Sequence, residues 1–512
     1  MNKTKKILIV VDYQNDFVSV NGALAVSGAE SIAPSIQKEI NNPKYTDVIY
    51  TMDTHMPADY PSSEEAEIFP DIHCEFNTPG WDLFEIKARS DIFTDFNCFE
   101  KPIDVQRDNE FVFVKDKFSV WEGNSNYKAW FTDRYDTDVE ITIVGVATNY
   151  CVFLNAIGYK EIGYDNVRVI EDCVKGIENF PDGSADPSFE VNMSKMKNQD
   201  IEFISSEDAD FEDFVVAAGN VMTPSKERVF EAIDRVRSYV RDYVKDSGLK
   251  SLVMGISGGL DSAVVAALCQ EEYIGVPLIG ISIPLSSSNT HKEMAEWVGN
   301  EYCTAFQEIN SWEEKKFAAQ ITAHELVDEA LKQVDIVAEM AGFNPAEFDT
   351  KVTQGNVKAR LRMITLYDLA RKTNGMVLST DNYSELWTGF FTLHGDHNDL
   401  GVIQYVEKYW EERPIAYALG IRADIIEQDP SDGLSVTEND TDEAQLGITY
   451  RELGPVIFGS EGRLPDDIQA QYEQIKNVPR VAAILKRNKA LQFKINWPHF
   501  IEREEIGFPD QF

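Results

Sequence analysis

The chain has 512 residues, 43% of them hydrophobic, and its 87 acidic and 47 basic side chains give a formal net charge of -40. This length predicts two or three domains, and the composition is that of a globular protein. So negative a surface repels phosphate backbones and anionic lipids, which argues against nucleic acid or a membrane as a partner.

Cysteine usage and the N-terminus bear on the compartment. Six cysteines without a C-x-x-C pair argue against a disulfide scaffold and against a thiolate zinc site. The apolar run near the N-terminus stops at Asp12, too early for a signal peptide, and no stretch approaches the roughly 18 apolar residues of a membrane span. We therefore expect a protein of the reducing cytoplasm.

The first third of the chain alternates strands with segments of helical spacing. Apolar, β-branched runs occupy residues 6–12, 47–53, 111–115, 140–147, 166–172 and 201–205. This pattern predicts an α/β domain with a doubly wound parallel sheet covered on both faces. Functional sites form at the carboxyl ends of such strands.

Polar side chains follow several of these strands. Asp53 and His55 lie on one side of an extended segment, and His73 follows in "FPDIHC". One carboxylate and two imidazoles suit Zn²⁺ or Fe²⁺. Two surface histidines on a long loop are the alternative interpretation.

A further acid, two lysines and a thiol complete the candidates. Asp12 ends the first strand, Lys115 and Lys117 lie at the end of the third, and Cys151 follows the fourth in "GVATNYCVF". Taken alone, the stretch around Cys151 favours a small buried hydrophobe over a nucleophile, and either lysine could be a side chain that lies along apolar surface.

Residues 1–206 resemble a nicotinamidase of the isochorismatase-like hydrolase family. The resemblance is carried by "VVDYQNDFVSVNGALAVSGAE", "DTH", "FPDIHCEFNTPG", "VKDKFS" and "GVATNYCV", which occur in the family's order. It implies hydrolysis of nicotinamide to nicotinate and ammonia through a cysteine thioester. The family pattern selects Lys115 because it precedes an aromatic residue, Phe118, by three positions.

The same resemblance implies the residue roles. The catalytic triad would be Asp12, Lys115 and Cys151, and the ligands of Zn²⁺, Fe²⁺ or Mn²⁺ would be Asp53, His55 and His73. A cis peptide would precede Ala147, the amides of Ala147 and Cys151 would form an oxyanion hole, and Phe17 and Phe69 would flank the substrate ring. Asn77 stands where the family has glycine, and a related amide such as pyrazinamide stays an alternative substrate.

An acidic and then small, apolar stretch over residues 207–222 is expected to be a linker. A helix should follow, with Thr223 as N-cap and Pro224 in its first turn, an apolar stripe that includes Val229 and Val240, and an end at Gly248. The run "SLVMGI" then predicts a strand.

The turn "GISGGLDS" joins that strand to a helix, so backbone amides and a helix N-terminus would face an anion. It resembles the S-G-G-x-D-S loop of ATP pyrophosphatases. With "GNVKARLRM", "STDNYSELWTGFFTLHGD" and "DEAQLGITY", residues 223–512 resemble ammonia-dependent NAD synthetase, with an adenine nucleotide alpha hydrolase-like fold.

This second resemblance implies that ATP activates the carboxylate of nicotinate adenine dinucleotide before ammonia displaces AMP. The ATP contacts would be Gly255, Ile256, Ser257, Gly258, Gly259, Leu260, Asp261, Ser262, Thr380, Lys408 and Ser431. Mg²⁺ would be held by Asp261 and Glu385, and the dinucleotide by Arg360, Asp396, Asp399 and Lys494. Leu393 and Phe493 depart from the family pattern.

The chain thus looks like a fusion of two enzymes of one NAD salvage route, and the family implies at least a homodimer. The fusion raises the hypothesis that ammonia released at Cys151 supplies the second domain, while joint production of two pathway steps is the simpler interpretation. The alternative class is an NAD-precursor sensor with degenerate sites. It would lack a nucleophile or metal ligands, yet Cys151, Asp261 and Glu385 are present.

Overall fold

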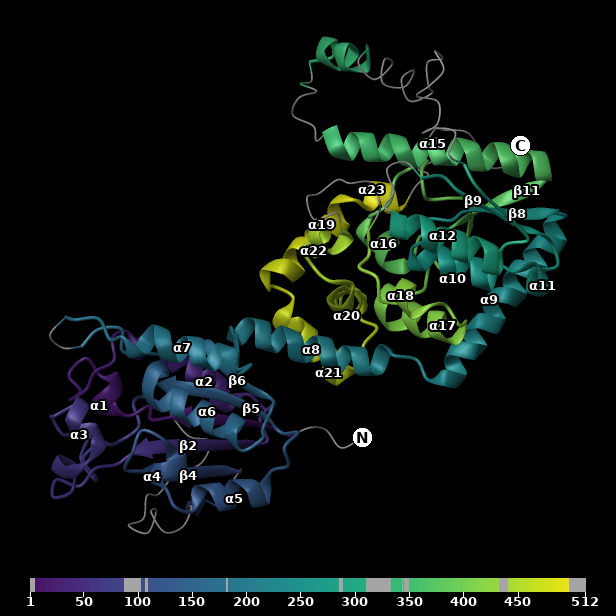
Figure 1. Cartoon of the computed structure of the whole chain (residues 1–512). Coiled ribbons are helices and arrows are strands. Elements are labelled where there is room, and N and C mark those ends of the chain that lie inside the picture. The colour runs from purple at the N-terminus through teal and green to yellow at the C-terminus, as the bar shows by residue number, and fades with distance from the viewer. Residues whose placement is uncertain are drawn as a thin grey trace, which may run out of the picture. The chain divides into compact units, whose positions relative to one another are not determined.

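A computed structural model describes residues 5–86, 103–105, 109–180, 183–284, 289–309, 333–342, 344, 350–431 and 441–496. The chain divides into two compact units, Met1–Asp210 and Phe211–Phe512, called here the N-terminal and C-terminal units. Each has its own sheet (Figure 1). Within the described residues, no helix is long and apolar enough to cross a membrane.

The N-terminal unit is built on a seven-stranded sheet in the order β3-β4-β2-β1-β5-β6-β7. Its strands are β1 (Lys6–Val11), β2 (Asp47–Asp53), β3 (Ile103–Val105), β4 (Glu110–Lys115), β5 (Glu140–Val146), β6 (Val167–Lys175) and β7 (Glu202–Ile204). All neighbours are parallel except β3, an edge strand that the sequence reasoning did not anticipate and that runs antiparallel to β4. The strand order reverses at β1, so the switch point lies between β1 and β5.

Helices cover both faces of this sheet because successive residues of each buried strand point to opposite sides. Leu8 and Val10 pack with α2 (Ala33–Asn41), whereas Ile7 and Ile9 pack with α5 (Tyr127–Arg134) and α6 (Phe153–Glu161). The other helices of the unit are α1 (Asn15–Val18), α3 (Glu64–Ile68), α4 (Val120–Gly123) and α7 (Ser188–Asn198). Short turns lie at Ala29–Ile32 and Tyr60–Ser62, and a π-turn, η3, at Thr148–Val152.

The segment expected to be a linker, residues 207–222, is helical and belongs to α8 (Ser206–Met222). Phe211, Phe214 and Ala218 recur at helical spacing and are buried in an apolar cluster of the C-terminal unit. The next helix, α9 (Lys226–Ser247), is capped by Ser225, whose hydroxyl accepts the Arg228 amide, and not by Thr223 as predicted. Its apolar stripe and its end at Gly248 are confirmed.

The C-terminal unit has a parallel five-stranded sheet in the order β10-β9-β8-β11-β12, with its switch point between β8 and β11. The strands are β8 (Ser251–Gly255), β9 (Leu278–Ser282), β10 (Ala305–Glu308), β11 (Gly375–Ser379) and β12 (Leu400–Gly401). Figure 1 shows α15 (Thr350–Thr373) along one face of this sheet and α9, α10 (Leu260–Leu268) and α12 (Asn289–Tyr302) on the other.

A separate apolar cluster of this unit is formed mainly by α8, α20 (Tyr450–Ser460), α21 (Asp466–Ile475) and α22 (Pro479–Ala490). The other helices of the unit are α11 (Glu271–Ile274), α16 (Tyr383–Thr388), α17 (Arg413–Ala418), α18 (Ala423–Ile426), α19 (Asp442–Leu446) and α23 (Gln492–Ile495). A second π-turn, η6, spans Lys408–Glu412.

Candidate active sites

The first site lies at the carboxyl edge of the N-terminal sheet, beside its switch point. Asp12 follows β1, while Asp53 and Lys115 end β2 and β4 and are partners in the strand register. Cys151 lies in η3, directly after β5. Gly145 permits this close packing, because a Cβ there would lie 2.1 Å from the Val11 carbonyl oxygen. The sequence-predicted acid, lysine and thiol therefore converge.

Lys115 is the centre of this group. Its Nζ lies 2.8 Å from Asp12 Oδ2, 3.2 Å from Asp53 Oδ1 and 3.7 Å from Cys151 Sγ. The Lys115 side chain is fully buried, and so are those of both carboxylates. Burial alone would lower the pKa of Lys115, but Asp12 and Asp53 outweigh it and hold that pKa well above its usual range. Lys115 is thus a permanent cation beside the thiol.

Asp12 is prepared to accept a proton. The Thr51 hydroxyl donates to its Oδ1 at 2.7 Å, and its backbone adopts a left-handed φ of 46°. Burial raises the pKa of Asp12 against the opposing effect of Lys115. Burial likewise raises the pKa of Cys151 well above its usual range, with Lys115 opposing. The resting thiol therefore keeps its proton, and a thiolate would form only if a neighbouring group such as Asp12 took that proton.

The turn that carries Cys151 has the backbone expected from the family resemblance. The Val146–Ala147 peptide is cis, as predicted. The Ala147 carbonyl accepts the amides of Tyr150 and Val152 at 3.0 and 3.1 Å. Asn155 Nδ2 donates to the Cys151 carbonyl at 2.7 Å. The amides of Ala147 and Cys151, expected to form the oxyanion hole, lie on this well-held turn.

A group of four buried side chains that could bind a metal lies next to the thiol. One ligand atom from each of Asp53, His55, Glu65 and His73 lies within 4.8 Å of the others. His55 Nε2 is 3.0 Å from Asp53 Oδ2 and 3.1 Å from Glu65 Oε2, and His73 Nε2 is 3.4 and 3.6 Å from the same two atoms. Two imidazoles and two carboxylates fit Zn²⁺ or Fe²⁺.

Glu65 was missed by the sequence reasoning. It lies on the short helix α3 among three acidic residues, and only Glu65 of these is buried. Burial lowers the pKa of His55 and of His73, but the hydrogen bonds that their rings donate to Asp53 and Glu65 outweigh burial and raise both pKa values to about 9. Without a metal these imidazoles are therefore cations that neutralise the two carboxylates.

Aromatic rings surround the metal-binding group. The Phe17 ring centroid lies 5.2 Å from that of His73, and the Phe69 centroid lies 6.4 Å from it. Phe69 also packs at 5.4 Å against Tyr150, which packs at 5.4 Å against Phe118. The two predicted ring residues are thus brought together around His73, and Phe118 and Tyr150 extend the aromatic wall beyond the prediction.

The second site begins at the turn between β8 and α10 in the C-terminal unit. Ser257 Oγ accepts the Gly259 amide at 3.1 Å and lies 3.0 Å from Ser262 Oγ. Gly258 has a φ of 86°, and a Cβ there would lie 2.4 Å from the His291 carbonyl oxygen. The loop is therefore closed against α12, and the α10 N-terminus opens toward a cavity, an arrangement suited to phosphate.

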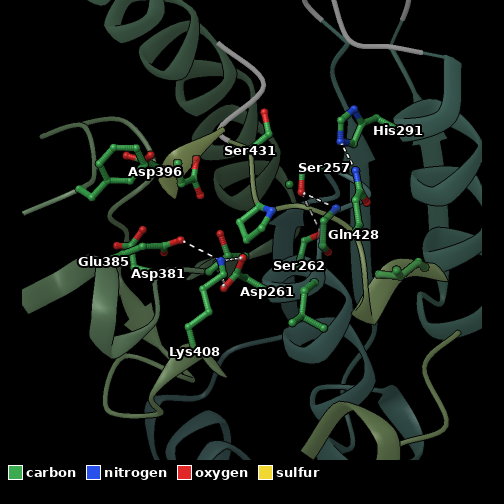
Figure 2. Close-up of a pocket in the computed structure, with 18 of the residues that line it drawn as sticks. Ser257, Asp261, Ser262, His291, Asp381, Glu385, Asp396, Lys408, Gln428 and Ser431 are labelled. Atoms are coloured by element: carbon green, nitrogen blue, oxygen red, sulfur yellow. Dashed lines mark hydrogen bonds and ion pairs between the residues drawn. The ribbon is translucent and has the colours of Figure 1, made fainter. Parts of the chain in front are cut away.

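Lys408 lies between the two predicted Mg²⁺ ligands (Figure 2). Its Nζ is 2.8 Å from Asp261 Oδ2 and 3.2 Å from Glu385 Oε1. Asn382 Nδ2 donates to Asp261 at 2.7 Å, while its own Oδ1 accepts the Glu385 amide in a capping box that starts α16. Two carboxylates held on neighbouring helix starts, with open space beside them, fit Mg²⁺.

The charges in this group are strongly coupled. Burial alone would raise the pKa of Asp261, but Lys408 outweighs burial and lowers this pKa below its ordinary value. Burial raises the pKa of Glu385 well above its usual range. The sequence reasoning missed Glu412, which is fully buried in the π-turn that carries Lys408. Its carboxyl oxygens accept no hydrogen bond from the described residues, and burial together with Asp261 raises its pKa.

A cavity of about 590 Å³ connects these elements. It is lined by the predicted nucleotide residues Gly255, Ile256, Ser257, Gly259, Leu260, Asp261, Ser262, Thr380, Glu385, Lys408 and Ser431, and also by Asp396. His291 and Gln428, which no motif indicated, lie at its side (Figure 2). Burial raises the pKa of Asp396 to about 7.

Four predicted residues, Gly258 among them, do not line the cavity. Arg360 Nε donates to the Leu393 carbonyl at 3.2 Å, and Lys494 Nζ to the Gly389 carbonyl at 2.7 Å. Asp399 is exposed and accepts the Tyr367 hydroxyl at 2.6 Å. In this structure three of the expected dinucleotide contacts therefore bind the protein's own groups.

Comparison with known proteins assigns both units. Residues 6–182 match the model of the isochorismatase domain, and residues 232–498 match that of NAD synthase. An NH(3)-dependent NAD(+) synthetase of Alkaliphilus oremlandii is 35% identical over 232 residues, which are 44% of this chain and 84% of that protein.

Solved structures similar to each unit are also known. A pyrazinamidase of Pyrococcus horikoshii in complex with zinc is 26% identical, with a TM-score of 0.30, and covers 39% of this chain and 99% of its own. An NMN synthetase of Francisella tularensis is 23% identical, with a TM-score of 0.41, and covers 54% of this chain and 98% of its own. The family models and the sequence relative show that this chain belongs to the NAD synthase family and carries an isochorismatase-type domain ahead of its NAD synthase domain.

Proposed function

We propose that the chain is a bifunctional enzyme whose N-terminal unit hydrolyses nicotinamide and whose C-terminal unit is an ammonia-dependent NAD synthetase. The observation that carries the first activity is the contact of Lys115 with Asp12, Asp53 and Cys151 at one sheet edge. The observation that carries the second is the serine- and glycine-rich loop that opens, beside Asp261 and Glu385, into a cavity of about 590 Å³.

In the proposed hydrolysis, Asp12 takes the thiol proton and Cys151 Sγ attacks the amide carbonyl carbon. The amides of Ala147 and Cys151 stabilise the oxyanion, an effect commonly worth about 3 kcal/mol per donor. Asp12 returns its proton to the departing nitrogen, so ammonia leaves and a thioester is formed. Water, deprotonated by Asp12, then attacks the thioester, and Cys151 recovers its proton as nicotinate is released.

The ring of the substrate would lie between Phe17 and Phe69, beside His73. Asp53, His55, Glu65 and His73 would hold the metal, which we propose to be Zn²⁺, Fe²⁺ or Mn²⁺. When bound, it would act as a Lewis acid that orients the pyridine nitrogen.

In the proposed synthetase reaction, the α10 N-terminus and the Ser257–Ser262 loop bind the phosphates of ATP. The nicotinate carboxylate of the dinucleotide attacks the α-phosphorus and pyrophosphate leaves. Ammonia then adds to the acyl adenylate, and AMP leaves as NAD forms. Mg²⁺ bound by Asp261 and Glu385 would neutralise phosphate charge. We propose that Arg360, Asp396, Asp399 and Lys494 contact the dinucleotide, and that the enzyme is at least a homodimer, which light scattering would test.

Two assays on the full chain test the proposal: ammonia release from nicotinamide, and AMP formation from ATP with nicotinate adenine dinucleotide and ammonium. Cys151→Ala should abolish only the first and Asp261→Asn only the second. Cys303→Ala, a partly buried thiol of the C-terminal unit, is the matched control and should retain both. Hydrolysis of nicotinamide by Cys151→Ala at the wild-type rate would refute the first assignment. Higher kcat/KM for pyrazinamide would redirect it to that amide.

A further inference from the structure

The two carboxylates expected to hold Mg²⁺ in the C-terminal unit already bind a cation of the protein itself. Lys408 Nζ contacts both oxygens of Asp261, at 2.8 and 3.1 Å, and Oε1 of Glu385 at 3.2 Å. The Lys408 side chain is only 7% exposed, and its pKa is held well above the usual range because Asp261 and Glu385 outweigh burial. In this structure Lys408 is therefore the counter-ion of the metal ligands.

An ammonium ion and a divalent metal cannot both make these contacts. A metal bound to Asp261 and Glu385 would lie within a few ångströms of Lys408 Nζ, where like charges repel strongly in a buried setting. Mg²⁺ gives up its water reluctantly and binds proteins through few carboxylates plus substrate phosphates. A metal ion that binds without a nucleotide would have to displace Lys408 from both carboxylates. It would bring no phosphate to which the displaced Lys408 could bind instead.

A nucleotide changes this balance because it supplies anions for Lys408. The lysine, both carboxylates and the phosphate loop all line the same cavity. Figure 2 shows the Lys408 side chain extending from the cavity wall to Asp261, with Ser257 and Ser262 on the far side of that carboxylate. Lys408 lies at the start of the π-turn η6, and such turns are frequent at functional sites.

We propose that Lys408 is an exchangeable counter-cation. It excludes divalent metal from the empty site and transfers to nucleotide phosphates when metal and nucleotide bind together. This inference rests on the proposed ATP site and goes beyond it, because it predicts that metal binding depends on the nucleotide and names the residue that causes the dependence.

The test is a titration of the full chain with Mn²⁺ in the absence of nucleotide. The electron paramagnetic resonance signal of free Mn²⁺ measures how much of the metal is bound. One molar equivalent of Zn²⁺ per chain, with free Zn²⁺ removed, first occupies the group of Asp53, His55, Glu65 and His73, and Asp261→Asn protein provides the baseline. Lys408→Gln and Lys408→Met should bind one Mn²⁺ at least about tenfold more tightly than wild type. Lys408→Arg keeps the charge and should resemble wild type. Lys372→Met, which removes an exposed lysine paired with Asp368, should change nothing.

Wild-type protein should gain Mn²⁺ affinity when α,β-methylene-ATP is added, after correction for Mn²⁺ bound by the free analogue, and Lys408→Gln should gain less. The proposal is overturned if the neutral variants bind Mn²⁺ no tighter than wild type, or if Lys408→Arg binds it as tightly as they do. A wild-type site that binds Mn²⁺ equally well with and without the analogue would also overturn it, even if no variant folds. Pyrophosphate release by the wild type separates the two ideas, because its absence would refute the proposed synthetase instead.

Discussion

Replacing Lys115 by methionine tests whether the buried cation holds the first site together. The substitution keeps an unbranched side chain but removes the charge that contacts Asp12 at 2.8 Å and Asp53 at 3.2 Å. Both carboxylates are 0% exposed, so neither can be solvated in its place. Removing one partner of a buried ion pair costs about 3–5 kcal/mol, and we expect Lys115→Met to lower the free energy of unfolding of the N-terminal unit by that amount.

The pH dependence follows from the same contacts. Without Lys115, burial of Asp12 is no longer opposed, and the folded-state pKa of Asp12 rises further above the ordinary value of 3.8, whereas Asp53 keeps His55 and His73 as partners. A folded state that binds protons more tightly than the unfolded chain loses stability as the pH rises from that value. The deficit of Lys115→Met against wild type should therefore be small near pH 4 and reach its full size at neutral pH.

The assay is urea unfolding of the full chain. Hydrogen exchange of peptides from β1 and β4 reports the unfolding of the N-terminal unit. Lys117→Met is the matched control, because Lys117 is exposed two residues further on. Its effect should stay within about 0.5 kcal/mol. Ammonia release should be lost in Lys115→Met and kept in Lys117→Met. A cost below about 1 kcal/mol at pH 7, or the same cost at pH 4, would refute the reasoning.

Three further predictions concern the metal group and the phosphate loop. Glu65→Gln should weaken Zn²⁺ binding at least about tenfold in a competition titration, whereas Glu64→Gln, an exposed neighbour, should not; equal effects would exclude Glu65 as a ligand. The thermal stability of the metal-free protein should fall from pH 6.5 to about 9, because His55 and His73 bind protons more tightly in the folded state. Bound Zn²⁺ should remove this loss. Equal stability across this pH range without metal would contradict the prediction. Gly258→Ala should abolish ATP binding, measured by calorimetry, because the added Cβ would lie 2.4 Å from the His291 carbonyl oxygen. Gly275→Ala, at a similar φ of 91° but with open space around it, should cost only about 1–2 kcal/mol of stability; ATP binding by Gly258→Ala would show that the loop tolerates the contact.

The positions of Asp12, Lys115 and Cys151 could be predicted because parallel strands bring their carboxyl ends to one edge. Once β1, β4 and β5 were recognised, the three side chains had to lie near one another. The same reasoning placed the Ser257–Ser262 loop, since a glycine-rich turn between a strand and a helix leaves little choice of direction.

Glu65 could not be predicted, because three acids share the first turn of α3 and only the path of the chain between His55 and His73 decides which faces inward. The prediction of Thr223 as the cap of α9 is wrong because Thr223, Pro224 and Ser225 all favour a helix N-terminus, and the sequence does not rank them. The acidic start of residues 207–222 predicts a linker, whereas the spacing of Phe211 and Phe214 places both on one side of a helix.

The two carboxylate oxygens of Asp53 contact two different groups of residues. Oδ1 faces Lys115, and Oδ2 faces both histidines of the metal group. A substitution at Asp53 would therefore remove a partner of Lys115 and a metal-binding side chain at the same time. Lost activity in such a variant could not be assigned to metal loss alone. The proposed site places the same constraint on evolution: metal preference could be changed through Glu65, His55 or His73, but a change at Asp53 would also alter the surroundings of Lys115 and of the proposed nucleophile Cys151.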